Sequence, residues 1–591
     1  MTDTKKLSYY LTTPIYYVNG VPHLGTAYTT IAADALARFE RMDGRDVWYL
    51  TGLDEHGQKV AQEAEKAGLS PQDWVDSIAP KFLEVWELLR ISNNDFIRTT
   101  EERHIKGVQR FFEKARENGY IYEDTYEGFY CVPDETFFTD EQLSDFAEKA
   151  YEEGKLAITD DGTKLCPDCN RPLIFFKEDN LFFRLSAFQD RLLAYYEANP
   201  EAICPEIRRN EVLSFVRGGL KDLSISRTAF NWGIPIPFAP GHVSYVWVDA
   251  LLNYITAIGY GFDDQVMQEE FAKRWPAQVQ FVGKDIIRFH CVIWPAMLMA
   301  ADIEPPQKVF AHGFLLTKGE KMSKSKGNAM SPQELSRVFG VDGYRYYFLR
   351  DVQFGSDGSI SLERMVQVYN SDLANSWGNL CSRAFNMTSK YFDGFVPGLS
   401  SDVAARLTGE LSNPLAALVE GLYERYAAAM NAIDYSGALA KAMELCDRTN
   451  LYIEESAPWS LAKAAAAVAA NAGAATAEAT TVGAANAVVT TVEAANAVTT
   501  TVEAGESGGA KGASERLAFV MYNILESIRI ATLLFAPVMP ITSTEVWRRL
   551  GLDDITTVTD LEQSLTWGGL PSGNRVEIGE PLFPRLKEDE L

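Results

Sequence analysis

Two short polar motifs, far apart in the chain, carry residue types suited to binding a polyphosphate. The first is Lys-Met-Ser-Lys-Ser at residues 321–325, which lies between Gly319 and Gly327. Glycines let the backbone approach an anion closely, and lysines are point charges that can follow phosphate oxygens as charge shifts in a transition state. A solvated basic turn has the same composition, so this motif needs a second element to establish a phosphate site.

The second motif, PHLGT at residues 22–26, follows a strand-like apolar run from Leu7 to Val18. A helix ending near Gly44 is predicted by apolar residues at three- and four-residue steps, namely Leu24, Tyr28, Ile31, Ala35 and Phe39. A strand, a turn and a helix N-terminus form an anion site, because backbone N–H groups point at the ligand. Taken alone, His23 is more often a capping or core histidine.

Together the motifs resemble the split HIGH and KMSKS signature of class I aminoacyl-tRNA synthetases. The order and spacing of six segments are similar to the methionyl-tRNA synthetases in particular: TTPIYYVNGVPHLG, LTGLDEHG, VWVDALLNY, FVGKDIIRFH, HGFLLTKGEKMSKSKGN and NSDLANSWGNLCSR. The resemblance implies an α/β fold, in which a Rossmann-like parallel-sheet catalytic domain contains an inserted connective domain. An all-α bundle that binds the anticodon is expected to follow.

The expected domains are the first half of the catalytic domain at 1–115, the connective insertion at 116–240, the second catalytic half at 241–310, the KMSKS loop with a stem-contact segment at 311–370, and the helical bundle at 371–591. Residues 462–512 are rich in Ala, Thr and Val and contain the repeats TTVGAANAVV, TTVEAANAVT and TTVEAGESGG. The family does not ordinarily have this stretch. Because β-branched residues and glycine interrupt the helix preference of alanine, we expect a mobile insertion.

The resemblance implies ATP-dependent activation of methionine to methionyl-adenylate, followed by transfer to the 3′ end of tRNA(Met), with Mg²⁺ assisting. The expected catalytic residues are His23, Lys321, Lys324 and Asp54. The expected ATP contacts are His23, Gly25, Thr26, Gly283, Asp285, Lys321, Ser323 and Lys324. Thr26 departs from the family pattern, because the signature usually ends in a second histidine, and we expect slower activation.

The residues expected around methionine also have a physical interpretation. Asp54 follows the apolar run Val47 to Leu50, at the carboxyl end of a predicted parallel strand, where open α/β sheets bind ligands. Its carboxylate can hold an ammonium group, or it can cap the next helix. Aromatic walls with one phenol or imidazole suit a thioether, although such stripes are more often core. By resemblance, the methionine contacts are Ile15, Tyr17, Asp54, Trp247, Ala250, Tyr254, Ile286 and His290.

A cysteine cluster within the expected insertion suggests a metal site. Cys166 and Cys169 have the spacing of a zinc knuckle, and Cys131 precedes Asp134, which stands where the family often has a cysteine. A structural zinc site needs four ligands. Two interpretations stay open, namely a zinc site made by Cys131, Asp134, Cys166 and Cys169, and a knuckle without metal.

Asn379 and Arg383 are four residues apart on a predicted helix, and Pro458 and Trp459 close a later one. An amide, a guanidinium and an indole can read splayed bases by hydrogen bonds and stacking. Ordinary helix packing is the better explanation of the local pattern, but the resemblance implies that these four residues read the CAU anticodon.

Composition limits the alternatives. The chain has 591 residues, 47% of them hydrophobic, seven cysteines and a net charge of −26. We expect a cytoplasmic protein with no membrane span, because no signal core and no uninterrupted apolar run of bilayer length is evident. The acidic total repels free RNA on average, so tRNA binding should depend on local basic patches and weaken with salt. With no appended dimerisation domain in the sequence, we expect a monomer.

Three rival interpretations remain. A synthetase for leucine, isoleucine or valine typically carries a large editing insertion, and one for cysteine needs a thiol that TTPIYY does not supply. A catalytically impaired RNA-binding paralogue is suggested by Thr26 and the unusual insertion. A smaller nucleotidyltransferase that shares the His-x-Gly-x loop would not need Asn379, Arg383 and Trp459.

Overall fold

The computed structural model describes residues 6–131, 136–138, 140–152, 157–159, 162–167, 169–317, 320–321, 331–467 and 508–587. They form two compact units, Met1–Ser361 and Leu362–Leu591. Each unit is described by itself.

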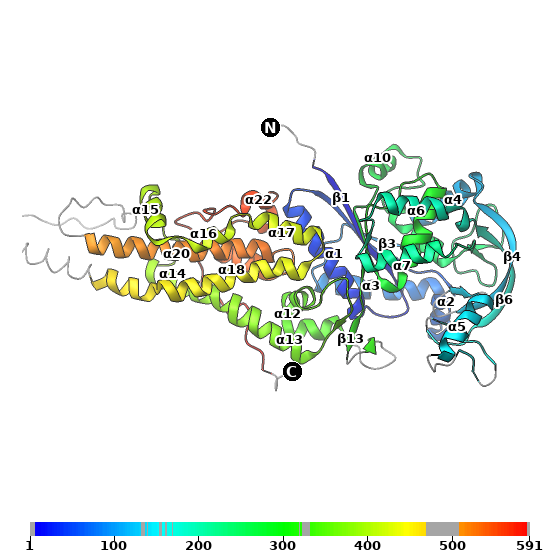
Figure 1. Cartoon of the computed structure of the whole chain (residues 1–591), viewed down its shortest axis with the longest axis horizontal. Helices are drawn as coiled ribbons and strands as arrows, with labels where there is room; N and C mark the ends of the chain where they lie inside the picture. Colours follow the sequence, from blue (N-terminus) through cyan, green and yellow to red (C-terminus); the bar gives the residue numbers. More distant parts are fainter. Residues whose placement is uncertain are drawn as a thin grey trace, which may run out of the picture. The chain divides into compact units, whose positions relative to one another are not determined.

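The first unit is built on a six-stranded parallel sheet (Figure 1). The strands, in spatial order, are β3 (Asp95–Arg98), β2 (Asp46–Asp54), β1 (Ser8–Tyr17), β11 (Val279–Gly283), β12 (Val309–His312) and β7 (Ile203–Cys204). The chain leaves β1 for β2 on one side and reaches β11 on the other, so the order reverses beside β1. Ligands of such sheets bind at the carboxyl ends of the strands at this switch point.

Helices cover this sheet, and the shared core includes Tyr10, Leu50, Phe111, Tyr254 and Trp294. The long helices of the unit are α1 (Leu24–Met42), α2 (Gln58–Ala67), α3 (Pro71–Leu88), α4 (Glu102–Glu117), α10 (Gln265–Arg274) and α12 (Pro332–Arg350). Shorter helices are α8 (Val246–Leu251), α9 (Asn253–Thr256) and α11 (Trp294–Ala300). The predicted α/β fold with a Rossmann-like parallel sheet is confirmed.

The segment between α4 and α8 contains an antiparallel sheet in the order β5-β4-β6-β8. Its strands are β4 (Ile121–Cys131), β5 (Thr136–Phe138), β6 (Ile174–Phe183) and β8 (Leu223–Ser224), and the accompanying helices are α5 (Asp140–Glu152), α6 (Gln189–Ala198) and α7 (Glu206–Arg217). The short strands β9 (Ser226–Arg227) and β10 (Val243–Ser244) pair with each other. One difference from the expected boundaries is β7, which lies inside 116–240 but pairs with β12 of the catalytic sheet. A strand of two residues has no period that sequence can reveal.

The second unit is helical (Figure 1). Its helices are α13 (Leu362–Val368), a π-helical segment (Tyr369–Gly378), α14 (Asn379–Phe392), α15 (Ser401–Leu411), α16 (Pro414–Val419), α17 (Leu422–Asn431), α18 (Tyr435–Ser456), α20 (Gly508–Phe535), α21 (Pro540–Arg549) and α22 (Leu561–Ser564). Helices α18 and α20 pack together along the bundle. Of the expected insertion at 462–512, residues 462–467 and 508–512 continue in helices, and 468–507 lie outside the described residues.

One helix of this unit, Gly512–Phe535, is apolar and long enough to cross a membrane by length and composition. No such run is predicted from the sequence, because Glu515, Arg516, Glu526 and Arg529 interrupt the apolar pattern. In the structure 94% of its most apolar window is buried. It is therefore the central core helix of the bundle.

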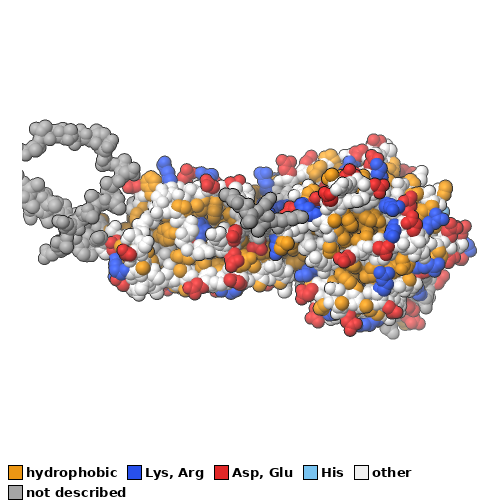
Figure 2. Space-filling model, turned by 90° about the horizontal axis from the view of Figure 1, so that it is seen from above, with side chains coloured by type: hydrophobic (Ala, Val, Ile, Leu, Met, Phe, Trp, Pro, Cys, Tyr) orange, Lys and Arg blue, Asp and Glu red, His pale blue; other side chains and the backbone are white. Residues whose placement is uncertain are grey.

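On the face drawn in Figure 2, acidic and basic side chains are interspersed with small apolar patches. This agrees with an acidic chain in which positive charge is local.

Candidate active site

The N-terminus of α1 lies directly after β1, and His23 is its N-cap. The His23 Nδ1 accepts hydrogen bonds from the backbone N–H groups of Gly25, at 3.1 Å, and Thr26, at 3.3 Å. The Thr26 hydroxyl accepts from the His23 backbone N–H at 3.4 Å, which completes a capping box. Because Nδ1 accepts, the imidazole is neutral and carries its hydrogen on Nε2. The structure thus shows the capping role for His23, with an exposed ring.

Gly25 allows this arrangement, since a Cβ at that position would lie 3.1 Å from Cε1 of His23. The same geometry changes the expected anion site. Two N–H groups that could have held phosphate already donate to the imidazole, so a phosphate can use them only after the ring rotates.

The carboxyl ends of β1 and β2 bring Tyr17 and Asp54 side by side, because these residues are partners in the parallel register. Asp54 is buried, with 3% of its surface exposed. It does not cap the following helix, because α2 starts after Gly57, and its N-cap makes no side-chain hydrogen bond. The carboxylate instead ends a strand at the switch point, where a ligand is expected.

Aromatic side chains converge on the same end of the sheet. Trp247 on α8 stacks on Phe289, with ring centroids 3.8 Å apart, and meets Tyr17 edge-on at 6.4 Å. Ile15 and Ile286 pack against the same core. Trp247 and Ala250 lie on α8, whereas Tyr254 lies on the next short helix, α9.

Tyr254 and His290 form a buried pair in this region. The His290 Nδ1–H donates to the Ile286 carbonyl at 3.0 Å, so Nε2 is the acceptor for the Tyr254 hydroxyl at 2.7 Å. Burial lowers the pKa of His290 to about 4, which keeps the ring neutral. Burial also raises the pKa of Tyr254, and Asp54 is near enough to contribute to that increase. The sequence-predicted methionine residues are therefore brought together.

The end of β11 carries Gly283, and Asp285 follows it. A Cβ on Gly283 would lie 2.5 Å from Asp285 Oδ1, so a larger residue there would displace the Asp285 side chain. Gly283 is the register partner of His312 at the end of β12. The His312 Nδ1–H donates to the Gly313 carbonyl at 2.8 Å, and Nε2 accepts from the Thr29 hydroxyl of α1 at 2.7 Å.

His312 and Thr29 were missed by the sequence analysis. The signal was available for His312, because it ends the apolar strand Val309–His312, and strand ends at a switch point line the ligand site. Burial lowers the pKa of His312, so it acts as a neutral link between the sheet and α1.

The chain that leads to the KMSKS segment begins beside these residues. Strand β13 (Leu315–Thr317) pairs antiparallel with β14 (Glu320–Lys321) and parallel with β15 (Gly358–Ser359). Asp357 accepts from the Phe314 backbone N–H at 2.8 Å and from the Lys284 ammonium at 2.7 Å. The base of the hairpin is thereby fixed to the segment that follows β11.

Of the predicted phosphate-binding residues in this segment, Ser323 and Lys324 lie outside the described residues, as do Lys318 and Lys326. Only the backbone strand of Lys321 is described. The far end of the segment is anchored at Ser331, whose hydroxyl accepts from the Glu334 N–H at 3.2 Å and starts α12.

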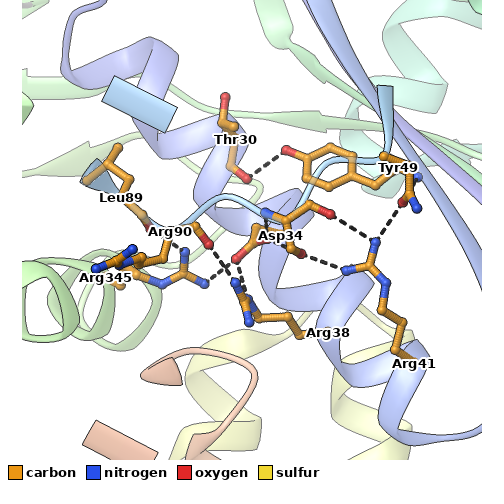
Figure 3. A network of polar contacts seen from close by, with 10 residues as sticks. Thr30, Asp34, Arg38, Arg41, Tyr49, Leu89, Arg90 and Arg345 are labelled. Carbon is orange, nitrogen blue, oxygen red and sulfur yellow. Dashed lines mark hydrogen bonds and ion pairs between the residues drawn. The ribbon is translucent and has the colours of Figure 1, made fainter. Parts of the chain in front are cut away.

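Helix α12 is in turn joined to α1 by a buried ion-pair network around Asp34 (Figure 3). The Asp34 carboxylate accepts from Arg345 at 2.6 Å and from Arg38 at 2.8 Å, and Ser92 donates to it as well. Burial opposes the charge, but Arg38 and Arg345 outweigh it and lower the pKa of Asp34 to about 2. The two helices that adjoin the HIGH-like and KMSKS motifs are therefore held together by charge.

Three cysteines in the inserted segment come together as expected. The Sγ atoms of Cys131, Cys166 and Cys169 all lie within 4.8 Å of one another, and those of Cys131 and Cys169 are 3.5 Å apart. A tetrahedral zinc ion with Zn–S bonds of about 2.3 Å separates its sulfurs by roughly 3.8 Å, so the three thiols fit this ion. Asp134 lies outside the described residues.

In the second unit, Asn379 and Arg383 of α14 line a polar hollow of about 400 Å³. The Arg383 guanidinium pairs with Glu454 of α18, at 2.5 Å. Pro458 and Trp459 begin the helical residues after α18, and Trp459 is 43% exposed. They are not part of the hollow's lining. The structure therefore brings together two of the four predicted anticodon residues.

Comparison with known proteins agrees with this architecture. A family model described as "tRNA synthetases class I (M)" matches residues 9–385. The methionine--tRNA ligase of Halalkalibacterium halodurans is 44% identical over 585 residues, covering 99% of this chain and 79% of that protein. The methionine--tRNA ligase of Bacillus subtilis is 43% identical and covers 99% of this chain and 78% of that protein.

A solved structure of Mycobacterium tuberculosis methionyl-tRNA synthetase, in complex with methionyl-adenylate, superposes with a TM-score of 0.81. It is 40% identical, and the match covers 98% of this chain and 100% of the other. The fold, the site at the switch point and these similarities lead to one conclusion: this chain belongs to the methionine family of class I tRNA synthetases.

Proposed function

We propose that this protein is a methionine--tRNA ligase, which activates methionine with ATP and transfers it to the 3′ end of tRNA(Met). The observation that carries the proposal is the convergence of Asp54, Trp247 and the Tyr254–His290 pair at the switch point of the sheet, in a chain of this family. We include in the proposal that it acts in the cytoplasm as a monomer.

The methionine end of the site follows from these residues. The buried Asp54 carboxylate can pair with the α-ammonium group, because opposite charges attract more strongly where little water screens them. Tyr17, Trp247 and Ala250, with Ile15 and Ile286, offer apolar surface for the thioether. The Tyr254–His290 pair satisfies its own hydrogen bonds, so this part of the wall needs no water and can accept an uncharged side chain.

The ATP end lies at the N-terminus of α1 and at Gly283 and Asp285. In the first step the methionine carboxylate attacks the α-phosphate, the bond to the β-phosphate breaks, and pyrophosphate leaves. No protein nucleophile is needed, so catalysis consists of positioning and charge stabilisation. His23 Nε2–H can donate to a phosphate oxygen, and Lys321, Ser323 and Lys324 are assigned to the leaving pyrophosphate. Mg²⁺, when bound, supplies further positive charge to the phosphates.

The second step transfers the methionyl group to the terminal ribose of tRNA. Asn379, Arg383, Pro458 and Trp459 are proposed to read the anticodon. In the free protein Arg383 is held by Glu454, so base recognition requires this exposed pair to exchange partners. The cysteine cluster is proposed to hold zinc through Cys131, Cys166, Cys169 and Asp134, with a structural rather than catalytic role.

One assay tests the main proposal. ATP–pyrophosphate exchange is measured with each amino acid in turn, with and without tRNA. Exchange that depends on methionine and does not need tRNA is the expected result. Exchange with a different amino acid would contradict the substrate assignment.

A second candidate function, an RNA-binding paralogue without activation, is favoured by one observation. Thr26 replaces the usual histidine, and in the structure its hydroxyl is used in the capping box. This candidate predicts tRNA binding without any amino-acid-dependent exchange, so the same assay separates the two.

A further inference from the structure

Asp249 lies at the centre of a buried polar chain that the two proposed steps do not use. Its Oδ2 accepts from Nδ1–H of His56 at 2.8 Å, and its Oδ1 accepts from Nε2–H of His104 at 2.7 Å. Asp249 and His104 are fully buried, and His56 is 5% exposed. Burial disfavours the carboxylate, but the two imidazoles outweigh it and lower the pKa of Asp249. A charged centre is therefore fixed inside the unit.

The three side chains come from elements that border the proposed methionine site. His56 lies two residues after Asp54, beyond the end of β2. Asp249 lies on α8 between Trp247 and Ala250. His104 belongs to α4, and its Nδ1 bonds the hydroxyl of Thr256 on α9, at 2.8 Å, two residues after Tyr254. The chain thus connects the residue proposed for the ammonium group with the residues proposed for the thioether.

The His56 end of this chain is itself held in place. The His56 ring meets Trp232 at 5.3 Å between centroids. The Trp232 indole N–H donates to the Glu55 carbonyl at 2.7 Å, and the Gly57 N–H donates back to the Trp232 carbonyl at 3.2 Å. The position of His56 is therefore fixed relative to the end of β2, and its hydrogen bond fixes Asp249 relative to the same point.

At the other end of the chain of hydrogen bonds, α8 and α9 need tertiary contacts to hold them in place, because α8 has six residues and α9 has four. Helices this short are not stable alone and depend on tertiary contacts. Apolar packing is not directional, whereas two short charge-assisted hydrogen bonds fix both distance and rotation. The orientation of Trp247, Ala250 and Tyr254 should therefore depend on Asp249.

We propose that His56, Asp249 and His104 form a positioning network that sets the distance between Asp54 and the wall made by Trp247, Ala250 and Tyr254. The network would thereby determine affinity and selectivity for the amino acid, without touching it. This inference rests on the proposed function. The affinity for a ligand that is bound at both ends depends on the distance between its two contacts, so methionine binding should depend on the network. The proposed ATP residues lie on α1 and after β11, outside the network, so ATP binding should not.

Three variants and one control test the network. His56→Phe and Asp249→Asn remove the donor and the charge, and His56→Asn is the conservative variant, because its amide N–H can replace Nδ1–H. The control is Glu526→Gln on α20 of the second unit. Glu526 is fully buried, pairs with Arg529 and accepts from the N–H groups of Gly568, Gly569 and Leu570, so like Asp249 it is a buried carboxylate with several hydrogen bonds.

The readouts are kcat, KM for methionine and KM for ATP in pyrophosphate exchange, together with the relative use of norleucine, which replaces the sulfur by a methylene. For His56→Phe and Asp249→Asn we expect KM for methionine to rise about tenfold or more, since a displacement near 1 Å can cost about 10²-fold. KM for ATP should change less than about twofold, and the preference for methionine over norleucine should fall. His56→Asn should recover most of the affinity, and Glu526→Gln should change neither KM.

Equal changes in both KM values, or no recovery in His56→Asn, would overturn the network and indicate a general structural role. An unchanged KM for methionine in folded His56→Phe would overturn it as well. If His56→Phe does not fold, Asp249→Asn keeps the side-chain shape and decides the question. Absence of methionine-dependent exchange in the unsubstituted protein would instead refute the proposed function, so the two failures are distinguishable.

Discussion

The imidazole of His23 can serve two roles, as the cap of α1 and as a donor to phosphate. In the structure it caps α1 through the N–H groups of Gly25 and Thr26, and under the proposed function it donates to phosphate. Capping contributes to stability, whereas phosphate binding contributes to rate. The two roles can be separated, because asparagine is a good cap but lacks the reach of a histidine.

We predict that His23→Asn keeps the free energy of unfolding within about 0.5 kcal/mol of the original, since Asn remains among the preferred cap residues. Adenylate formation should fall by about 10²-fold, which is the usual loss from removing one charge-stabilising donor. His23→Ala should lose both. Single-turnover pyrophosphate release and urea unfolding measure the two effects, and an unaltered rate in His23→Asn would leave His23 with the capping role alone.

His290 gives a prediction about pH. A histidine in the unfolded chain has a pKa near 6.5, and burial lowers the folded value to about 4. The folded state therefore binds fewer protons, so stability from the neutral ring is complete above about pH 6.5 and is lost as pH falls toward 4. The difference corresponds to about 3 kcal/mol.

Comparing unfolding free energies of the original chain and His290→Gln between pH 7 and pH 4 isolates this contribution, because all other groups are shared. The original should lose up to about 3 kcal/mol more than the variant over this range. Parallel pH curves for the two proteins would mean that His290 is not kept neutral by burial.

Sequence predicts a residue of the site when its position follows from the local pattern, and it fails when the position depends on a partner that is distant in the chain. Asp54 and Tyr17 were predictable, because strand ends of a parallel sheet meet at one edge. His104 and Asp249 were not, because each is a lone polar residue on an apolar helical face, where a satisfied core residue is the usual explanation. Only the fold shows that they bond to each other.

At the scale of elements, the Asp34 network joins α1 to α12 (Figure 3). Arg345 and Asp34 are both fully buried, so removing either one takes a main partner away from a charge that stays inside the unit, although Arg38 still pairs with Asp34. Such single removals typically cost about 3–5 kcal/mol, whereas replacing a whole pair by apolar residues can be neutral.

We therefore predict that Asp34→Asn and Arg345→Met each destabilise the first unit by about 3 kcal/mol or more. The double substitution Asp34→Asn with Arg345→Met should be destabilised by less than the sum of the two single losses. The exposed pair of Lys66 and Glu63 is the control, and its removal should cost less than about 1 kcal/mol. Additive losses in the double variant, measured by urea unfolding, would contradict coupling between the two helices.

The cysteine cluster is a second element whose role can be tested. If zinc is held there, purified protein should contain about one zinc ion per chain, bound by thiolates. Cobalt substitution should give a thiolate charge-transfer band, which Cys166→Ser weakens and Asp134→Ala shifts. Chelation should increase proteolysis of the segment around β4 and β6, with little effect on unfolding of the second unit. Protein without stoichiometric metal or a cobalt band would support the knuckle without metal.

The bounds of helices and strands, like single site residues, can be predicted from sequence only where the local pattern specifies them. The strand, turn and helix at Leu7 to Gly44 were predictable, because local periodicity and turn residues specify them. The pairing of Ile203–Cys204 with β12 was not, since it depends on a neighbour that arrives much later in the chain.

At the scale of the whole molecule, the chain consists of two compact units, and the proposed functional residues fall in both. The proposed activation residues belong to Met1–Ser361, and the proposed anticodon residues belong to Leu362–Leu591. Because pyrophosphate exchange does not need tRNA, the two sets of residues can be tested in the same full-length protein with different assays.

Arg383 and Trp459 should matter only when tRNA is present. A polar contact to a base edge contributes roughly 1–3 kcal/mol, and stacking on an exposed aromatic contributes a similar amount. We predict that Arg383→Ala and Trp459→Ala each lower kcat/KM for aminoacylation about tenfold or more, with methionine-dependent exchange unchanged.

Arg406→Ala is the matched control, because Arg406 is also paired with glutamates of the bundle and does not line the polar hollow. A loss of exchange in Arg383→Ala, or an equal loss of aminoacylation in Arg406→Ala, would show that the bundle acts through stability rather than through base recognition.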